Sequence, residues 1–149
     1  MPKRIGFIIN PAAAAGRCPA RWAGLQNRFR QDGIQGKSRF TTHPGDAVRF
    51  AQELGRECDV VVAVGGDGTI SEVASGLLLA GDTNTVLGVI PLGTGNDAAR
   101  QFGINDFTQA RLALQGDRTK AVDVIRIRCQ IEGREFCRFL CAGIAQQRC

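Results

Sequence analysis

The sequence predicts an α/β protein built on a doubly wound parallel sheet, and three observations lead to this fold class. Strand-like and helix-like segments alternate from residue 4 to residue 115. The segment 59–64 is apolar almost throughout, as expected for a strand covered on both faces of a parallel sheet. Two glycine-rich turns follow strand-like segments and lead straight into helix-like ones. Such alternation is typical of βαβ units.

The elements follow in order along the chain. An apolar strand at 4–9 ends at Asn10-Pro11, and Trp22, Leu25 and Phe29 recur at helical spacing in a helix at 20–31. A polar, alternating strand is expected at 37–42, and Asp46 is expected to cap the next helix. The remaining strands are expected at 59–64 and 86–92, and the remaining helices at 69–80, 97–102 and 107–115.

The pattern changes near residue 121. Residues 121–131 and 134–142 both look extended and are joined at Glu132-Gly133, which predicts a β-hairpin without an intervening helix. We therefore expect an α/β domain over 1–120 and the start of a second, β-rich domain over 121–149.

Length and composition exclude several classes of protein. The 149 residues are 44% hydrophobic and 22% charged, which is typical of a globular chain and not of a disordered one. No stretch approaches the ~18 apolar residues of a membrane-spanning helix. The first apolar run is too short for a signal peptide, so we expect a soluble, cytoplasmic protein.

Charge and cysteine spacing give little specific chemistry. Residues 1–56 hold ten lysines and arginines against three acidic residues, but these are interleaved, and no aromatic-and-basic motif predicts nucleic-acid binding. The six cysteines contain no Cys-x-x-Cys pair and the chain has one histidine, so structural zinc and disulfides are disfavoured and free thiols are expected.

The first chemically informative loop is Gly65-Gly66-Asp67-Gly68-Thr69, between the clearest strand and a helix. Glycines allow close approach of a ligand to the backbone, and a helix N-terminus favours phosphate. The alternative is a tight turn in which Asp67 caps the helix.

The second loop is Gly93-Thr94-Gly95-Asn96-Asp97, again between a strand and a helix. It matches G-x-G-x-x-A formally, but it does not follow the first strand as a dinucleotide fingerprint should. No P-loop motif is present. With one aspartate in each glycine loop, the two loops predict a shared phosphate site in which Asp67 and Asp97 place magnesium.

Two further strand ends carry polar residues. Asn10 offers an amide after the first strand, and Thr41 ends the second strand before Gly45-Asp46-Ala47. An ordinary Asn-Pro turn and a structural threonine are the alternative interpretations.

Taken in order, Asn10-Pro11, Thr41-x-x-x-Gly45-Asp46-Ala47, the Gly65–Thr69 loop with Glu72, and Pro91-Leu92-Gly93-Thr94-Gly95-Asn96-Asp97 resemble the catalytic-domain signature of the diacylglycerol kinase family, especially its bacterial lipid kinases. The resemblance covers about residues 4–144. The Gly-Gly-Asp-Gly-Thr motif is shared with NAD and sphingosine kinases, and the Pro-Leu-Gly-Thr-Gly-Asn-Asp segment favours the diacylglycerol kinase branch.

The resemblance implies ATP-dependent phosphorylation of a lipid hydroxyl at a membrane surface, with a β-sandwich domain following the α/β domain. Asp67 and Asp97 would then organise the catalytic Mg²⁺. The residues implied in binding ATP are Asn10, Thr41, Gly65, Gly66, Asp67, Gly68, Thr69, Ser71, Glu72, Gly93, Thr94 and Asn96. In this interpretation the Asp67 carboxylate serves magnesium and not the fold, so Asp67→Asn is expected to weaken Mg-dependent ATP binding and to change stability by no more than roughly 0.5 kcal/mol.

The sequence also departs from the family pattern. Four alanines stand after Asn10-Pro11 in place of a serine-glycine, and Ser71 replaces a frequent asparagine. Family members are about twice as long, so we expect a truncated or frame-shifted fragment whose own activity is left open. The alternatives are a catalytically inactive ATP-binding fragment and a relative of NAD kinase.

Overall fold

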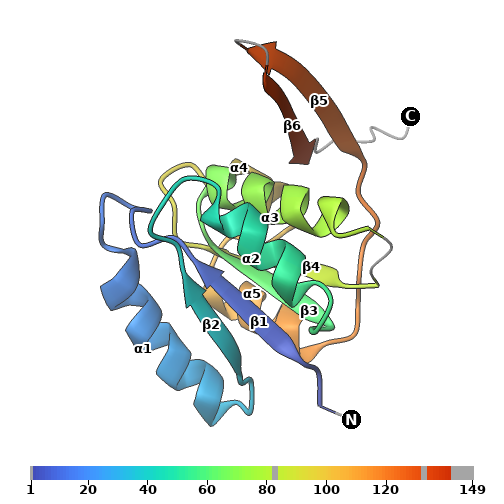
Figure 1. The fold of residues 1–149 in the computed structure, drawn as a ribbon. Coiled ribbons are helices and arrows are strands. Elements are labelled where there is room, and N and C mark those ends of the chain that lie inside the picture. The colour runs from blue at the N-terminus through green and yellow to red at the C-terminus, as the bar shows by residue number, and fades with distance from the viewer. Residues whose placement is uncertain (1, 82–83, 132–133, 142–149) are drawn as a thin grey trace, which may run out of the picture.

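The chain, described here from a computed structural model, forms a four-stranded parallel sheet with helices on both faces, followed by an antiparallel hairpin (Figure 1). The structure describes residues 2–81, 84–131 and 134–141, and side chains as far as residue 128. The doubly wound fold predicted from the sequence is confirmed. The elements are β1 (Ile5–Ile9), α1 (Cys18–Gln31), β2 (Gly36–Phe40), α2 (Asp46–Leu54), β3 (Val60–Gly65), α3 (Asp67–Leu79), β4 (Val86–Pro91), α4 (Asp97–Gln101), α5 (Phe107–Gln115), β5 (Val124–Ile131) and β6 (Arg134–Cys141).

The strand order is β2-β1-β3-β4, so the chain reverses its direction of winding between β1 and β3. Every pair in this sheet is parallel, and Ile5 of β1 aligns with both Gly36 of β2 and Val60 of β3. All six residues of β3 are buried, as its apolar sequence predicts. Because the four strands are parallel, the loops that follow them emerge at one edge of the sheet.

Two hydrophobic clusters hold the layers together. On one face, Trp22 and Phe29 of α1 and Leu114 of α5 pack on β1, β3 and β4. On the other face, Phe50 and Leu54 of α2 and Val73 of α3 pack on alternate residues of the same strands. Figure 1 shows α2 and α3 lying together across the sheet, with α5 on the opposite side.

The N-termini of three helices differ from the prediction, in each case next to a glycine or a proline. α1 begins at Cys18, two residues earlier than expected, because Pro19 suits the first turn of a helix. α3 begins at Asp67 with Gly66 as N-cap, which places Asp67 and Gly68 on its first turn. The prediction that Asp46 caps α2 is wrong: Gly45 is the N-cap, at φ +88°, and Asp46 is the first helical residue.

The predicted hairpin is present. β5 pairs antiparallel with β6, from Val124 opposite Cys141 to Ile131 opposite Arg134, and β6 contacts α3. Its expected turn, Glu132-Gly133, lies outside the described residues. Cys18 and Cys58 are free and buried, as expected, and the other four cysteines lie beyond the described side chains. No helix in the described ranges has the length and apolarity needed to cross a membrane.

Candidate phosphate-binding site at the carboxyl edge of the sheet

All the candidate residues lie at or just beyond the carboxyl ends of the four parallel strands. Asn10 follows β1, Thr41 follows β2, Gly66 follows β3, and the segment from Leu92 to Asn96 follows β4. Open α/β sheets bind ligands at this edge, where the winding direction reverses. Here the winding direction reverses between the neighbouring strands β1 and β3.

The two glycine loops touch through their backbones at Gly66 and Gly93. A Cβ atom added to Gly93 would lie 2.3 Å from Gly66 Cα and 2.9 Å from Gly66 N. A Cβ atom on Gly66 would lie 3.2 Å from Gly93 Cα. Any side chain at Gly93 would therefore push the loops apart, and these glycines bring the two turns within van der Waals contact.

Asn96 shapes the second glycine loop. It adopts a left-handed conformation, with φ at +57°, which asparagine tolerates better than most residues. Its Oδ1 accepts the Gly93 N–H at 3.0 Å, and its Nδ2 donates to the Gly93 carbonyl at 3.0 Å. The side chain thus closes the turn on itself and directs the chain into α4.

Asp67 joins the two loops. Its Oδ1 accepts the Ala98 N–H at 2.8 Å, and its Oδ2 accepts the Asp97 N–H at 3.2 Å. A carboxylate at the first amides of a helix satisfies donors that have no partner within the helix. Asp67 therefore stabilises the start of α4, a role that contradicts the expectation that it serves magnesium and not the fold.

Gly95 belongs to this arrangement although it was not among the predicted site residues. A Cβ atom there would lie 3.0 Å from Asp67 Oδ2. The second glycine of the Gly-x-Gly turn was the available signal in the sequence.

Asn10 and Thr69 connect β1 to the first glycine loop. The Asn10 Nδ2 group donates to Thr69 Oγ1 at 3.1 Å, and Asn10 Oδ1 accepts the Ala12 N–H at 3.0 Å. Thr69 is buried beneath Gly65, where an added Cβ would lie 2.5 Å from the threonine oxygen. The Asn10 and Thr69 side chains therefore hold the first glycine loop against the end of β1.

Thr41 is held at the end of β2, where its backbone N–H donates to the Ile9 carbonyl at 2.9 Å. Beside it, Asp46 Oδ2 accepts the backbone N–H groups of Thr42 and His43, each at 2.9 Å. These bonds, with Arg49 on the other oxygen, hold the pKa of the Asp46 carboxyl well below its usual range. Asp46 thus orders the turn before α2 instead of capping the helix.

The remaining candidates surround the N-terminus of α3. Ser71 and Glu72 are half-buried on its first turns, and Gly68 and Thr94 are exposed. The Asp97 side chain is 73% exposed and pairs with Arg100. The N-cap residue of α3 is Gly66, which has no side chain to accept the first amides of the helix. These amides are thus available to an anion, because the first N–H groups of a helix have no partner within it.

The described residues include no cluster of three or more histidine, cysteine or acidic side chains that could hold a metal ion by itself. Asp67 and Asp97 are the predicted magnesium ligands, and their carboxylates are of the donor type that this ion prefers. The two residues lie next to each other where the glycine loops meet, since the Asp67 carboxylate accepts the backbone N–H of Asp97. The pair fits an ion that takes its other ligands from phosphate oxygens and water.

The comparisons with known proteins agree with one another. Residues 4–127 match the family model described as the diacylglycerol kinase catalytic domain. The chain is 43% identical over 103 residues to a diacylglycerol kinase of Bacillus subtilis (strain 168), a match covering 68% of this chain and 34% of that protein. It is 44% identical over 104 residues to a probable lipid kinase YegS-like of Klebsiella pneumoniae (strain 342), with the same coverage.

A solved structure shares the fold. The crystal structure of a diacylglycerol kinase from Bacillus anthracis str. Sterne matches with a TM-score of 0.72 and 28% identity, covering 90% of this chain and 48% of that one. The chain thus spans about a third of the curated relatives and half of the solved one.

Proposed function

The chain belongs to the diacylglycerol kinase catalytic-domain family, and from this premise we propose that it is the nucleotide-binding half of an ATP-dependent lipid kinase. The reaction is the transfer of the γ-phosphoryl group of ATP to a hydroxyl of diacylglycerol or a related lipid. The hydroxyl oxygen forms a bond to the γ-phosphorus, the bond from the γ-phosphorus to the β,γ-bridging oxygen breaks, ADP leaves with that oxygen, and the hydroxyl proton passes to water.

The contact between Gly66 and Gly93 carries the proposal for ATP. At Gly66 and Gly93 the loops meet without an intervening side chain, next to the N-terminus of α3, whose N-cap Gly66 has no capping side chain. Backbone N–H groups and the positive end of the helix dipole together favour phosphate groups at such a position. We therefore assign the ATP phosphates to the surface formed by the residues Gly65 to Thr69 and Gly93 to Asn96.

The remaining polar candidates lie around the surface assigned to the ATP phosphates. Asn10 and Thr41 lie at the ends of β1 and β2, on one side of the glycine loops. Ser71 and Glu72 lie on α3, and Thr94 is exposed at the tip of the second loop. We assign these five side chains to contacts with the nucleotide.

Asp67 and Asp97 are the residues proposed to hold Mg²⁺ together with ATP. The ion would neutralise charge on the phosphates, the main requirement of phosphoryl transfer. Asp67 would do this while its oxygens also accept the amides of α4, since each carboxylate oxygen has more than one lone pair. Its position is thereby fixed by the second glycine loop before any ligand binds.

The lipid is proposed to reach the site from a membrane surface, with the protein bound peripherally at the inner face of the membrane. A diacylglycerol substrate resides in a bilayer, so the enzyme has to approach it there. The names of the relatives in Bacillus subtilis and Klebsiella pneumoniae support a lipid as the acceptor.

A glycine variant tests nucleotide binding without disturbing the fold. Gly68 is exposed on the first turn of α3, and a Cβ atom there meets nothing within 4 Å. Gly68→Ala adds a methyl group on the surface assigned to phosphate, and we expect it to weaken Mg-ATP binding about tenfold or more, a loss of at least ~1.4 kcal/mol. Isothermal titration calorimetry measures the affinity, with sulfate as a control for nonspecific anion binding.

Gly24→Ala is the matched control. Gly24 is exposed in α1 and also has open space around its Cβ position. In both variants, replacing glycine by alanine in a helix should stabilise the fold by a similar amount, about 0.5–1 kcal/mol. If the Gly68→Ala and Gly24→Ala variants bind Mg-ATP with equal affinity, the ATP phosphates do not bind at the N-terminus of α3.

Transfer of radiolabelled phosphate from ATP to diacylglycerol vesicles tests the reaction itself. Label in the lipid would support the kinase. A second assay joins this chain to the second half of a full-length relative. If Mg-ATP binds but neither protein transfers label to the lipid, the chain is better interpreted as a module that binds nucleotide without catalysis.

A further inference from the structure

Thr41 stands where the chain leaves β2 and turns toward α2, at the edge of the sheet that carries the glycine loops. The residue is half-buried, and its neighbours Thr42 and His43 are exposed. A side chain at such a turn meets a ligand in one reproducible position only if the backbone is fixed on both sides of it. Different parts of the molecule fix the two sides of Thr41.

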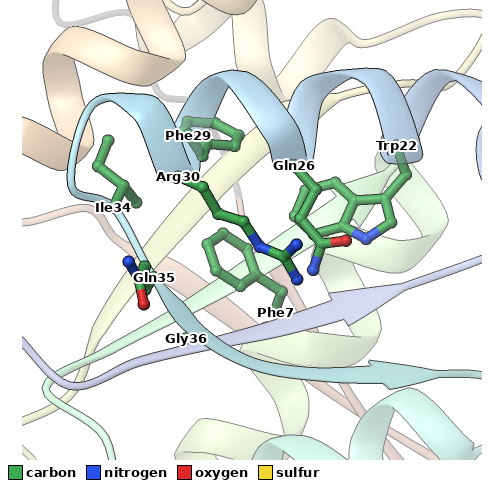
Figure 2. A pocket seen from close by; sticks show the side chains of 8 residues that line it. All are labelled: Phe7, Trp22, Gln26, Phe29, Arg30, Ile34, Gln35 and Gly36. Carbon is green, nitrogen blue, oxygen red and sulfur yellow. The ribbon is translucent and has the colours of Figure 1, made fainter.

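On the strand side, β1 fixes the backbone that leads to Thr41. The Thr41 N–H donates to the Ile9 carbonyl at 2.9 Å, which continues the parallel pairing of β2 with β1. β2 begins at Gly36, where an added Cβ atom would lie 2.2 Å from the Ile5 carbonyl oxygen. Figure 2 shows Gly36 at this point, with the Phe7 ring between the strands and α1. β2 is therefore held against β1 from its start to Thr41.

On the other side of Thr41, the Asp46 carboxylate fixes the turn. Its Oδ2 accepts the backbone N–H groups of Thr42 and His43, each at 2.9 Å, and the Thr42 hydroxyl at 3.0 Å. In return, the Asp46 N–H donates to the His43 carbonyl at 3.2 Å. Gly45 permits the reversal of the chain because its backbone is left-handed, at φ +88°. The turn is thus closed on itself directly after Thr41.

Asp46 is held in its turn by side chains of its own helix. Arg49 Nη2 lies 3.1 Å from Asp46 Oδ1, and the Asp46 side chain is only 14% exposed. The Arg49 guanidinium also lies over the ring of Phe50, 4.5 Å from the ring centroid, and Phe50 is buried between α2 and the sheet. Both carboxylate oxygens therefore have partners from the protein itself, and the turn is ordered before any ligand binds.

Resting on the proposed function, in which Thr41 contacts the nucleotide, we propose that Asp46 is a positioning residue for ATP. Asp46 acts through Thr41, because it fixes the backbone that follows Thr41 while β1 fixes the backbone that precedes it. A side chain already held in its binding position loses less conformational freedom when the ligand arrives, and the affinity is higher for that reason. A loosened turn would have to be ordered at the moment of binding, so the affinity would fall.

A double-mutant cycle in Mg-ATP affinity tests this role. Thr41→Val removes the hydroxyl assigned to the nucleotide. Asp46→Asn leaves one acceptor oxygen where there were two, so its NH₂ group faces either Arg49 or the amides of the turn. We expect each single variant to lower the affinity about fivefold in isothermal titration calorimetry. The double variant should bind only as weakly as Thr41→Val, because Asp46 acts through Thr41.

Glu53→Gln is the matched control. Glu53 also pairs with Arg49, but it lies near the other end of α2. Its substitution should leave the Mg-ATP affinity unchanged, which separates the position of Asp46 from the loss of one acidic partner of Arg49.

Gly45→Ala disturbs the same turn with the Asp46 carboxylate intact. A Cβ atom on Gly45 meets nothing within 4 Å, so only the left-handed backbone is strained. This variant should lower the affinity in the same Thr41-dependent manner, and it replaces Asp46→Asn in the cycle if that protein does not fold. All affinities are measured on protein that is folded by circular dichroism.

Four results would overturn the role of Asp46. Losses of affinity that add in the double variant would show that Asp46 does not act through Thr41. A lower urea midpoint with unchanged affinity in Asp46→Asn would make its role purely structural. If Thr41→Val binds Mg-ATP normally, Thr41 and Asp46 leave the nucleotide site, while binding at the glycine loops stands. If the unmodified protein does not bind Mg-ATP, the proposed function fails and this role fails with it.

Discussion

The Asp67 carboxylate accepts the backbone N–H of Ala98 at 2.8 Å, across 31 positions of sequence. This bond joins the first turn of α3 to the first turn of α4 and so fixes one glycine loop against the other. The residue predicted to place magnesium is therefore also part of the framework that positions the phosphate-binding surface.

Asp67→Asn should consequently destabilise the fold. The amide group of asparagine has one acceptor oxygen in place of two, and its NH₂ would face an N–H of α4. We expect a loss of about 1–2 kcal/mol in the free energy of unfolding, measured by urea denaturation, as for other helix-capping side chains. This replaces the value of about 0.5 kcal/mol expected from the sequence.

Asp97→Asn is the matched control for that loss. The Asp97 carboxylate is largely exposed and pairs only with the nearby Arg100 among the ion pairs of the described residues. Its removal should change stability by less than about 0.5 kcal/mol, because exposed ion pairs contribute little. If the two variants are equally stable, Asp67 does not support α4.

Gly93→Ala should separate the glycine loops. The new Cβ would lie 2.3 Å from Gly66 Cα, a contact with backbone that no rotamer change relieves. We expect about 1–3 kcal/mol of destabilisation in urea denaturation, together with a loss of Mg-ATP affinity. Gly68→Ala, which has open space around its Cβ position in the first glycine loop, should lose no stability. A Gly93 variant that is as stable as Gly68→Ala would contradict the close packing of the two loops.

Asn10 and Thr69 should show energetic coupling. Thr69→Val keeps the shape of the buried side chain but removes the acceptor of the Asn10 amide. In a double-mutant cycle with Asn10→Ala, we expect a coupling energy of about 1 kcal/mol. The cycle cancels the separate loss of the bond from Ala12 to Asn10. Strictly additive changes in unfolding free energy would show that this bond contributes nothing.

The stability contributed by Asp46 should depend on pH. Hydrogen bonds from Thr42, His43 and Arg49 lower the pKa of Asp46 in the folded protein, relative to an ordinary value of 3.8. The folded state therefore holds the charged form more strongly than the unfolded state does. The resulting stability is present above about pH 4 and is lost as the pH falls from there toward the folded pKa.

Urea midpoints of the unmodified protein and Asp46→Asn test this dependence. The difference between them should be largest near neutral pH and should narrow below about pH 4. Glu53→Gln is the control, since Glu53 also pairs with Arg49 on α2 but is exposed. A difference that stays constant with pH would show that the Asp46 charge is not responsible.

Local sequence patterns were sufficient to predict most elements of the fold. The apolar run of β3 predicted burial on both faces, and all six of its residues are buried. Glu132-Gly133 between two extended segments predicted the pairing of β5 with β6. Periodicity and turn residues are properties of neighbouring positions, so they are visible in one sequence. That the two glycine loops share an edge also followed from the sequence, because parallel strands place their carboxyl ends together.

The sequence by itself thus determined the parallel sheet, the order of its helices and the edge at which the polar loops gather. Only the tertiary structure decided what each polar group does there. Asp67 was expected to serve a metal and not the fold, and it does serve the fold, because it accepts two amides of α4. Asp46 was expected to cap α2, and it accepts amides of the turn before that helix. Hydrogen bonding depends on ångström distances between residues far apart in the chain, and spacing along a sequence does not encode those distances until the sheet has brought the loops together.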